Sequence, residues 1–177
     1  MRTVKKNKVK TLVMAGLFLA LGMVLPTLTG NIKEIGDSLL PMHLAVMLCG
    51  VICGCQYGLA VGLLMPFLRA VFFGMPPIYP NAIWMALELA AYGFVIGFLY
   101  RRRKTYSRAY LFCCLVASMF AGRAVWGVAK AVLLGVGGKP FGIKAFLVGG
   151  FIDAIPGLIL QFILIPLVVE LLEKRKK

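Results

Sequence analysis

Five ionisable side chains lie inside long apolar segments of this sequence, and they are the residues best able to support chemistry. They are Arg69, Glu88, Arg123, Lys130 and Asp153. A charged side chain at membrane depth is costly, so it normally faces a polar interior, has a partner and marks a functional site. Three of the five are cationic and two are anionic. The surplus positive charge favours an anionic group, such as a carboxylate, on any ligand that these residues bind.

The composition assigns the chain to the integral membrane class. Hydrophobic residues make up 61% of the sequence and charged residues 15%, and the mean hydropathy is +0.92. A soluble domain of this length would be far more polar. The net charge of +14 lies in short clusters at the ends of apolar segments rather than on one face. This pattern excludes nucleic-acid binding and is typical of membrane topology signals.

The apolar segments predict an all-α integral membrane protein, with a single membrane domain over residues 1–177 and six transmembrane helices. Residues 42–73 are too long for one span of about 20 residues. The sequence GCQYG at positions 54–58 is the expected break, so the second span is predicted to be short or irregular. The predicted spans are 12–28, 42–55, 57–73, 81–100, 109–135 and 145–172.

The basic residues predict the orientation of these helices. Fourteen of the 20 lysines and arginines fall in three clusters, at positions 2–10, 101–108 and 174–177. With six spans, all three clusters lie on one side of the membrane. The positive-inside rule therefore predicts that both termini are cytoplasmic. Threaded in this orientation, the ionisable residues of the spans lie in the outer half of the membrane, except Arg123, and His43 lies at the outer surface.

Helical periodicity places these residues on three polar stripes, since positions i, i+3, i+4 and i+7 share a face. Stripes that face one another would form an outward-open pocket with ionic anchors and aromatic walls. The alternative is that Glu88–Arg123 and Asp153–Lys130 are purely structural ion pairs. The stripes are Asn81, Trp84, Glu88 and Tyr92; Arg123, Trp126, Gly127 and Lys130; and Gly149, Asp153 and Gly157.

The candidate substrate-binding residues combine these stripes with two neighbours. Glu88 and Arg123 are predicted to form the floor of the pocket, and the turn at 74–81, rich in glycine and proline, is predicted to act as a gate. The full candidate set is Arg69, Tyr79, Asn81, Trp84, Glu88, Tyr92, Arg123, Trp126, Lys130 and Asp153.

The sequence predicts no catalytic residues, no metal site and no cofactor. The five cysteines lie in apolar segments without paired C-x-x-C spacing, and the chain has one histidine. None of the three serines stands in a G-x-S-x-G setting, so an enzyme is disfavoured.

Five short segments resemble the substrate-binding S components of energy-coupling factor (ECF) transporters. They are LPMHL at 40–44, GCQYGLAVG at 54–62, GMPP at 74–77, ELAAYG at 88–93 and GR at 122–123. The resemblance implies a six-helix subunit in the bacterial cytoplasmic membrane that captures a vitamin or related micronutrient from outside the cell. It also implies partners: membrane lipid, a transmembrane coupling subunit and two ABC ATPases. The chain itself has no ATP-binding motif.

The first predicted span carries a candidate contact for the coupling subunit. The family typically has an A-x-x-x-A surface there, and this chain has Gly16 and Ala20 at the same spacing. Small residues at i and i+4 let another helix approach closely, although glycine and alanine are also simply common in membrane helices.

The main alternative function is an autonomous proton-coupled secondary transporter, in which Glu88 and Asp153 relay protons. That class favours inverted repeats and helices broken near the midplane in both halves. No convincing internal repeat is present in the sequence.

Overall fold

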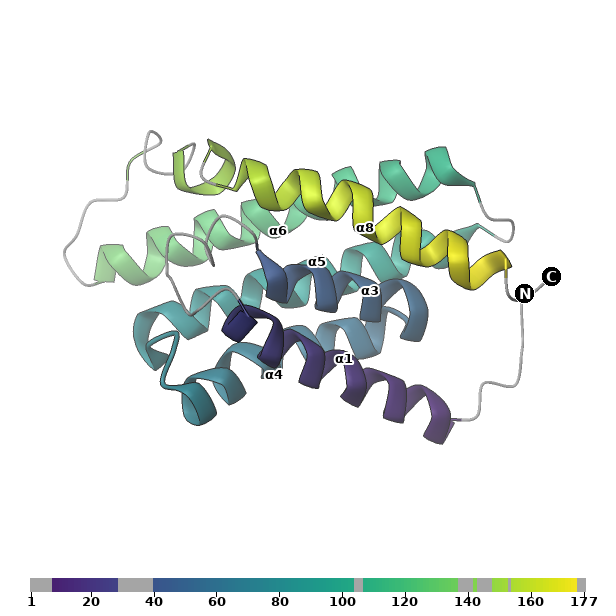
Figure 1. Ribbon diagram of the computed structural model, residues 1–177. Coiled ribbons are helices and arrows are strands. Elements are labelled where there is room, and N and C mark those ends of the chain that lie inside the picture. Colours follow the sequence, from purple (N-terminus) through teal and green to yellow (C-terminus); the bar gives the residue numbers. More distant parts are fainter. Residues whose placement is uncertain are drawn as a thin grey trace.

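The computed structural model describes residues 8–28, 40–103, 107–136, 142, 148–152 and 154–174. Every regular element in this part of the chain is helical, which confirms the predicted all-α class (Figure 1). The elements are α1 (Lys8–Leu28), α3 (Pro41–Cys53), α4 (Cys55–Phe73), the short turn η1 (Ile78–Ala82), α5 (Ile83–Arg102), α6 (Arg108–Val136), the short turn η2 (Val148–Ile152) and α8 (Ile155–Lys174).

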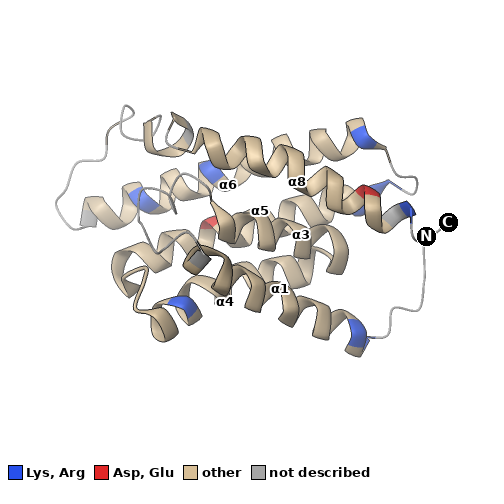
Figure 2. Cartoon of the chain, viewed as in Figure 1, with Lys and Arg blue, Asp and Glu red and all other residues tan. Residues whose placement is uncertain are grey.

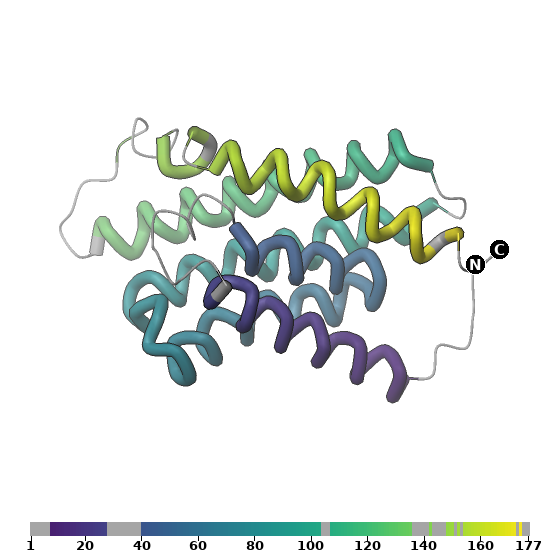
Figure 3. Tube along the Cα trace, in the orientation of Figure 1, coloured from purple at the N-terminus to yellow at the C-terminus, as the bar shows by residue number. Residues whose placement is uncertain are grey.

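The helices alternate in direction and form one bundle around α5 (Figures 1 and 3). Helix α5 packs against α3, α4 and α6, α1 covers α3 and α4, and α8 packs on α3 and α6. Helix α1 begins and α8 ends at the same end of the bundle, where lysine and arginine residues gather (Figure 2). This grouping agrees with the three basic clusters found in the sequence. That this end of the bundle faces the cytoplasm stays a prediction.

Within the described residues, five helices are long and apolar enough to cross a membrane. The exception is α3, which has 13 residues and is therefore about 20 Å long at the helical rise. The hydrocarbon core is about 30 Å thick, so α3 is too short to span it alone. The prediction of a short second segment is confirmed, whereas six full spans are not. The predicted last span, 145–172, lies close to the candidate span Val148–Leu172, in which η2 precedes α8.

The break between α3 and α4 falls on a single residue of the predicted GCQYG segment. Gly54 has φ +110°, a conformation that residues with a side chain rarely adopt. Arg101, near the end of α5, donates a hydrogen bond from Nη2 to the carbonyl oxygen of Cys53. A side chain at Gly54 would overlap the Arg101 guanidinium. The turn therefore requires glycine for two reasons: the backbone has a positive φ, and a side chain would displace the Arg101 guanidinium that stabilises the turn.

Glycines bring α3, α4 and α5 into backbone contact. A Cβ atom at Gly93 would overlap the backbone of Gly58, and one at Gly50 would overlap the carbonyl oxygen of Gly93. Lipid tails are as apolar as leucine, so membrane helices associate largely through such close packing. These contacts fix α5 against its neighbours, and α5 carries Glu88.

We expect Gly93→Ala to destabilise the bundle, because the new methyl group has no space between α4 and α5. Overpacking of this kind costs about 1–3 kcal/mol. Thermal unfolding in detergent measures the effect. Gly135→Ala is the matched control, since a Cβ atom at Gly135, on α6, meets nothing within 4 Å. Equal melting temperatures for the two variants would contradict the close packing of α5.

Candidate functional site: a buried ion pair beside an apolar cavity

The centre of the site is an ion pair between Glu88 on α5 and Arg123 on α6. Arg123 Nη1 lies 2.9 Å from Glu88 Oε1. Both residues are buried, with 2% of Glu88 and 4% of Arg123 exposed. Tyr92, one turn after Glu88, packs against Gly122, where a Cβ atom would overlap the tyrosine ring. The predicted stripes on α5 and α6 therefore face each other.

His43 on α3 is the third member of this cluster. Its Nε2 lies 3.3 Å from Glu88 Oε1, and its ring meets that of Tyr92 edge-on at a centroid distance of 5.1 Å. The expectation that His43 lies at the outer surface is wrong, because only 2% of the residue is exposed. It stands in the first turn of α3, and that short helix lies inside the bundle. A single histidine within a long apolar run was the signal that could have identified it.

The close distances in the cluster are not aligned hydrogen bonds. In the part of the chain that the structure describes, Glu88 Oε1 has no partner with hydrogen-bond geometry, and neither has His43 Nε2. Arg123 Nε and Nη2 and the Tyr92 hydroxyl group are also buried without a hydrogen-bond partner among the described residues. A buried donor without a partner costs about 1–3 kcal/mol, and more if it is charged. The cluster thus holds unused hydrogen-bonding capacity at a buried position.

An aromatic layer adjoins the ion pair on α5 and α6. Lys130 Nζ lies 4.5 Å from the centroid of the Trp126 ring and 5.5 Å from that of Trp84. The Arg123 guanidinium carbon lies 5.9 Å from the Trp126 centroid. Such cation–π contacts contribute about 0.5–2 kcal/mol each, depending on desolvation. The structure therefore brings together four of the predicted binding residues, Trp84, Arg123, Trp126 and Lys130.

The turn η2 closes on this aromatic layer. A Cβ atom at Gly149 would lie 3.5 Å from the Trp126 ring, and one at Gly150 would lie 3.4 Å from it. The third predicted stripe thus approaches α6 at Gly149. Asp153, the charged member of that stripe, lies outside the described residues.

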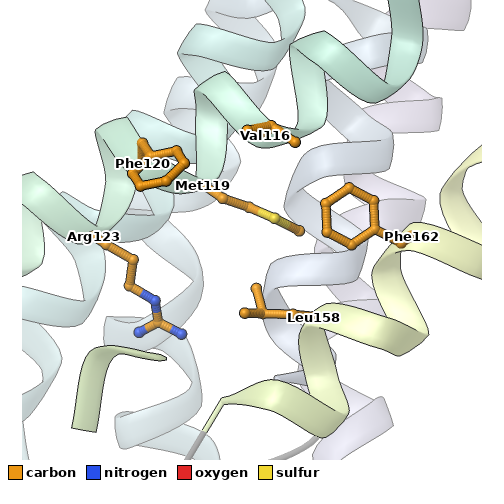
Figure 4. A pocket seen from close by; sticks show the side chains of 6 residues that line it. All are labelled: Val116, Met119, Phe120, Arg123, Leu158 and Phe162. Atoms are coloured by element: carbon orange, nitrogen blue, oxygen red, sulfur yellow. The ribbon is translucent and has the colours of Figure 1, made fainter. Parts of the chain in front are cut away.

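A cavity of about 200 Å³ opens between α6 and α8 beside Arg123 (Figure 4). Side chains from both helices converge on it, and Val116 and Phe120 are exposed, so its outer rim is open. The described lining residues other than Arg123 have apolar side chains, and Arg123 itself presents no polar surface to the cavity. The lining residues are Val116, Met119, Phe120, Arg123, Leu158 and Phe162.

Three other predicted site residues have surroundings of their own. Arg69 donates a hydrogen bond from Nη1 to the carbonyl oxygen of Met23 on α1 at 2.7 Å, and its guanidinium lies over the Phe73 ring. Tyr79, in η1, is 61% exposed, and Asn81 is half-buried. The contacts described for Arg69 tie it to the α1–α4 interface rather than to Glu88.

Gln161 is a second polar residue that periodicity did not single out. It lies on α8, it is 1% exposed, and both atoms of its amide lack hydrogen-bond partners among the described residues. It lies three residues after Leu158, so the two side chains share a helix face. One glutamine in an otherwise apolar helix was its only sequence signal.

Comparison with known proteins gives one match. The model of a family described as the substrate-specific component of ECF transporters matches residues 10–169. No curated protein and no solved structure matches the chain. The family match covers most of the sequence and all of the residues in the cluster described above. This chain therefore belongs to the family of ECF transporter substrate-specific components.

Proposed function

We propose that this protein captures a small vitamin or related micronutrient from outside a bacterial cell and holds it beside the Glu88–Arg123 pair. The observation that carries the proposal is the buried guanidinium of Arg123, which contacts Glu88 and has two nitrogens without a hydrogen-bond partner among the described residues. The family is that of substrate-specific components of ECF transporters. The cluster supports a binding role because it gathers buried polar groups that lack hydrogen-bond partners among the described residues. In this proposal Glu88 fixes the position of Arg123 through the ion pair. Trp84, Trp126 and Lys130 form one wall of the binding site next to Arg123.

The same proposal assigns the turn at 74–81 as the gate of the binding site. Gly74 ends α4 in a left-handed conformation with φ +70°, and Tyr79 in η1 has an extended backbone between helical residues. An irregular turn of this kind can change shape without unfolding a helix. Arg69, Tyr79, Asn81, Tyr92 and Asp153 remain proposed binding residues.

Transport itself is proposed to need partners: a transmembrane coupling subunit and two ABC ATPases in the cytoplasmic membrane. Family membership does not favour the alternative of an autonomous proton-coupled transporter. Helix α1 offers a surface for the coupling subunit, because Gly16 and Ala20 are exposed. A Cβ atom at Gly16 would meet nothing within 4 Å, so the backbone there is open to another helix.

We expect the protein, purified in detergent from cells grown in rich medium, to carry a stoichiometric small molecule. Denaturation followed by mass spectrometry identifies it. Protein that is empty, and that binds no vitamin by calorimetry, would contradict the proposed function.

The role of Glu88 is tested with the molecule identified in that way. Glu88→Gln removes the charge that holds Arg123, so we expect affinity to fall about tenfold or more, since disrupting a buried charge pair costs about 2–5 kcal/mol. Calorimetry measures the change. Glu170→Gln is the matched control, because Glu170 pairs with Arg108 and Lys174 at the exposed end of α8. Equal affinities for both variants and the native protein would place the ligand elsewhere.

The α1 surface makes a separate prediction. Gly16→Leu with Ala20→Leu should abolish co-purification with a tagged coupling subunit, because bulky side chains prevent a close helix approach. Ligand binding should be unchanged. The control is Val128→Leu with Val132→Leu, at two exposed positions on α6. Intact complexes with the α1 double variant would assign the partner to another surface.

A further inference from the structure

We propose that the cavity between α6 and α8 binds an acyl chain of an anionic phospholipid, whose headgroup lies at the end of the bundle where α6 begins and α8 ends. The proposal concerns a lipid of the surrounding membrane and is independent of the small molecule proposed to bind beside Glu88 and Arg123. Three observations carry it: the chemistry of the cavity lining, the depth of the cavity along both helices, and the charge at that end of the two helices.

The lining of the cavity is suited to hydrocarbon. The volume is about 200 Å³, and the described lining residues present only apolar surface to it, including the aliphatic part of Arg123 (Figure 4). A buried water molecule needs about two to four polar partners, whereas an engineered apolar cavity of about 150 Å³ stays dry and binds benzene. A hydrocarbon chain therefore fits this cavity, and water does not.

The rim of the cavity is open to the membrane. Val116 and Phe120 on the rim are exposed, and so are Ile159 and Ile163 on the neighbouring turns of α8. Both helices belong to segments long and apolar enough to cross a bilayer, so these side chains face lipid tails. An empty cavity leaves its lining atoms without dispersion contacts on one side. A lipid chain that enters from the rim restores those contacts and stabilises the packing of α6 against α8.

The depth of the cavity matches the length of an acyl chain. On α6, the lining residue Phe120 lies twelve residues after Arg108, and on α8, Phe162 lies twelve residues before Lys174. Each separation is about 18 Å at the helical rise. One leaflet of the hydrocarbon core is about 15 Å thick. A phospholipid with its headgroup beside Arg108 and Lys174 would therefore place the end of a chain at the cavity.

The charge at that end of the two helices favours an anionic headgroup. Arg108 and Lys174 both pair with the single carboxylate of Glu170, so these three residues together carry one surplus positive charge. The side chains of Arg108 and Lys174 are 64% and 72% exposed, and other lysines and arginines gather at the same end of the bundle (Figure 2). Basic side chains at a membrane surface attract anionic lipids. A zwitterionic headgroup would bring no net charge to balance the surplus.

The test uses the purified full-length protein in phosphatidylcholine vesicles that contain a small fraction of labelled phosphatidylglycerol. The label is a diazirine at the end of one acyl chain; on illumination it attaches to neighbouring residues, and mass spectrometry locates the adducts. We expect adducts on Met119 and Leu158, which line the cavity, in excess of adducts on Ile159 and Ile163, which face bulk lipid at the same depth. Adducts on the two isoleucines alone would overturn the proposal.

The same label on phosphatidylcholine tests the headgroup. We expect about fivefold weaker labelling of Met119 at equal mole fraction, as for loss of one attractive charge at a membrane surface. Lys174→Gln should remove this difference between the lipids, whereas Lys8→Gln should not, because Lys8 starts α1 and lies outside the α6–α8 pair. Equal labelling by both lipids in the native protein would overturn the anionic headgroup. Loss of labelling on addition of palmitate, but not of unlabelled phosphatidylglycerol, would assign the cavity to a free fatty acid instead.

A variant that fills the cavity tests where the chain lies. Leu158→Trp places a larger side chain in the cavity, so we expect it to abolish the adducts on Met119. Ile163→Trp, on the exposed face of the same helix, should leave them unchanged. If Leu158→Trp fails to fold, the ratio of Met119 adducts to Ile163 adducts in the native protein still decides between a bound chain and bulk lipid. Adducts on Met119 that persist in folded Leu158→Trp protein would overturn the placement.

Discussion

The structure depends on the cost of burying Glu88 and Arg123 inside an apolar bundle. Each charge alone would lose several kcal/mol of solvation, and the attraction between them offsets this only when they are in contact. At 2.9 Å they are in contact, which ties α5 to α6 at one depth. Removal of either partner leaves an uncompensated buried charge, at a cost of about 3–5 kcal/mol. The register of these two helices is therefore set by electrostatics as well as by packing.

Close packing of small residues makes this contact possible. Gly58 and Gly93 bring α4 against α5, and Gly122 leaves space for the Tyr92 ring. With side chains at these positions the helices would separate, and the ion pair would lengthen or admit water and lipid. The short helix α3 then fits beside α5 and delivers His43 to Glu88. Backbone contacts between glycines thus determine where the charges lie.

Periodicity was sufficient to predict which faces of α5 and α6 meet, since Glu88 and Arg123 stand out in apolar helices. It could not predict the depth of His43, because a position directly after the predicted helix start at residue 42 was interpreted as surface-exposed, whereas the neighbouring helices bury it. The contact of Arg69 with the Met23 carbonyl depends on how α1 crosses α4, and no local pattern encodes that crossing. The break at Gly54 was predictable, because glycine tolerates the positive φ of such a turn.

The geometry of the cluster bears on whether the ion pair is only structural. A structural pair gains most when its hydrogen bonds are aligned and all donors have acceptors, and well-packed apolar residues often serve stability equally well. Here, among the described residues, Glu88 Oε1 lacks an aligned hydrogen bond and two guanidinium nitrogens lack acceptors. An ion pair with so many unmet hydrogen bonds is poor as a purely structural device, which favours a role for it beyond stability.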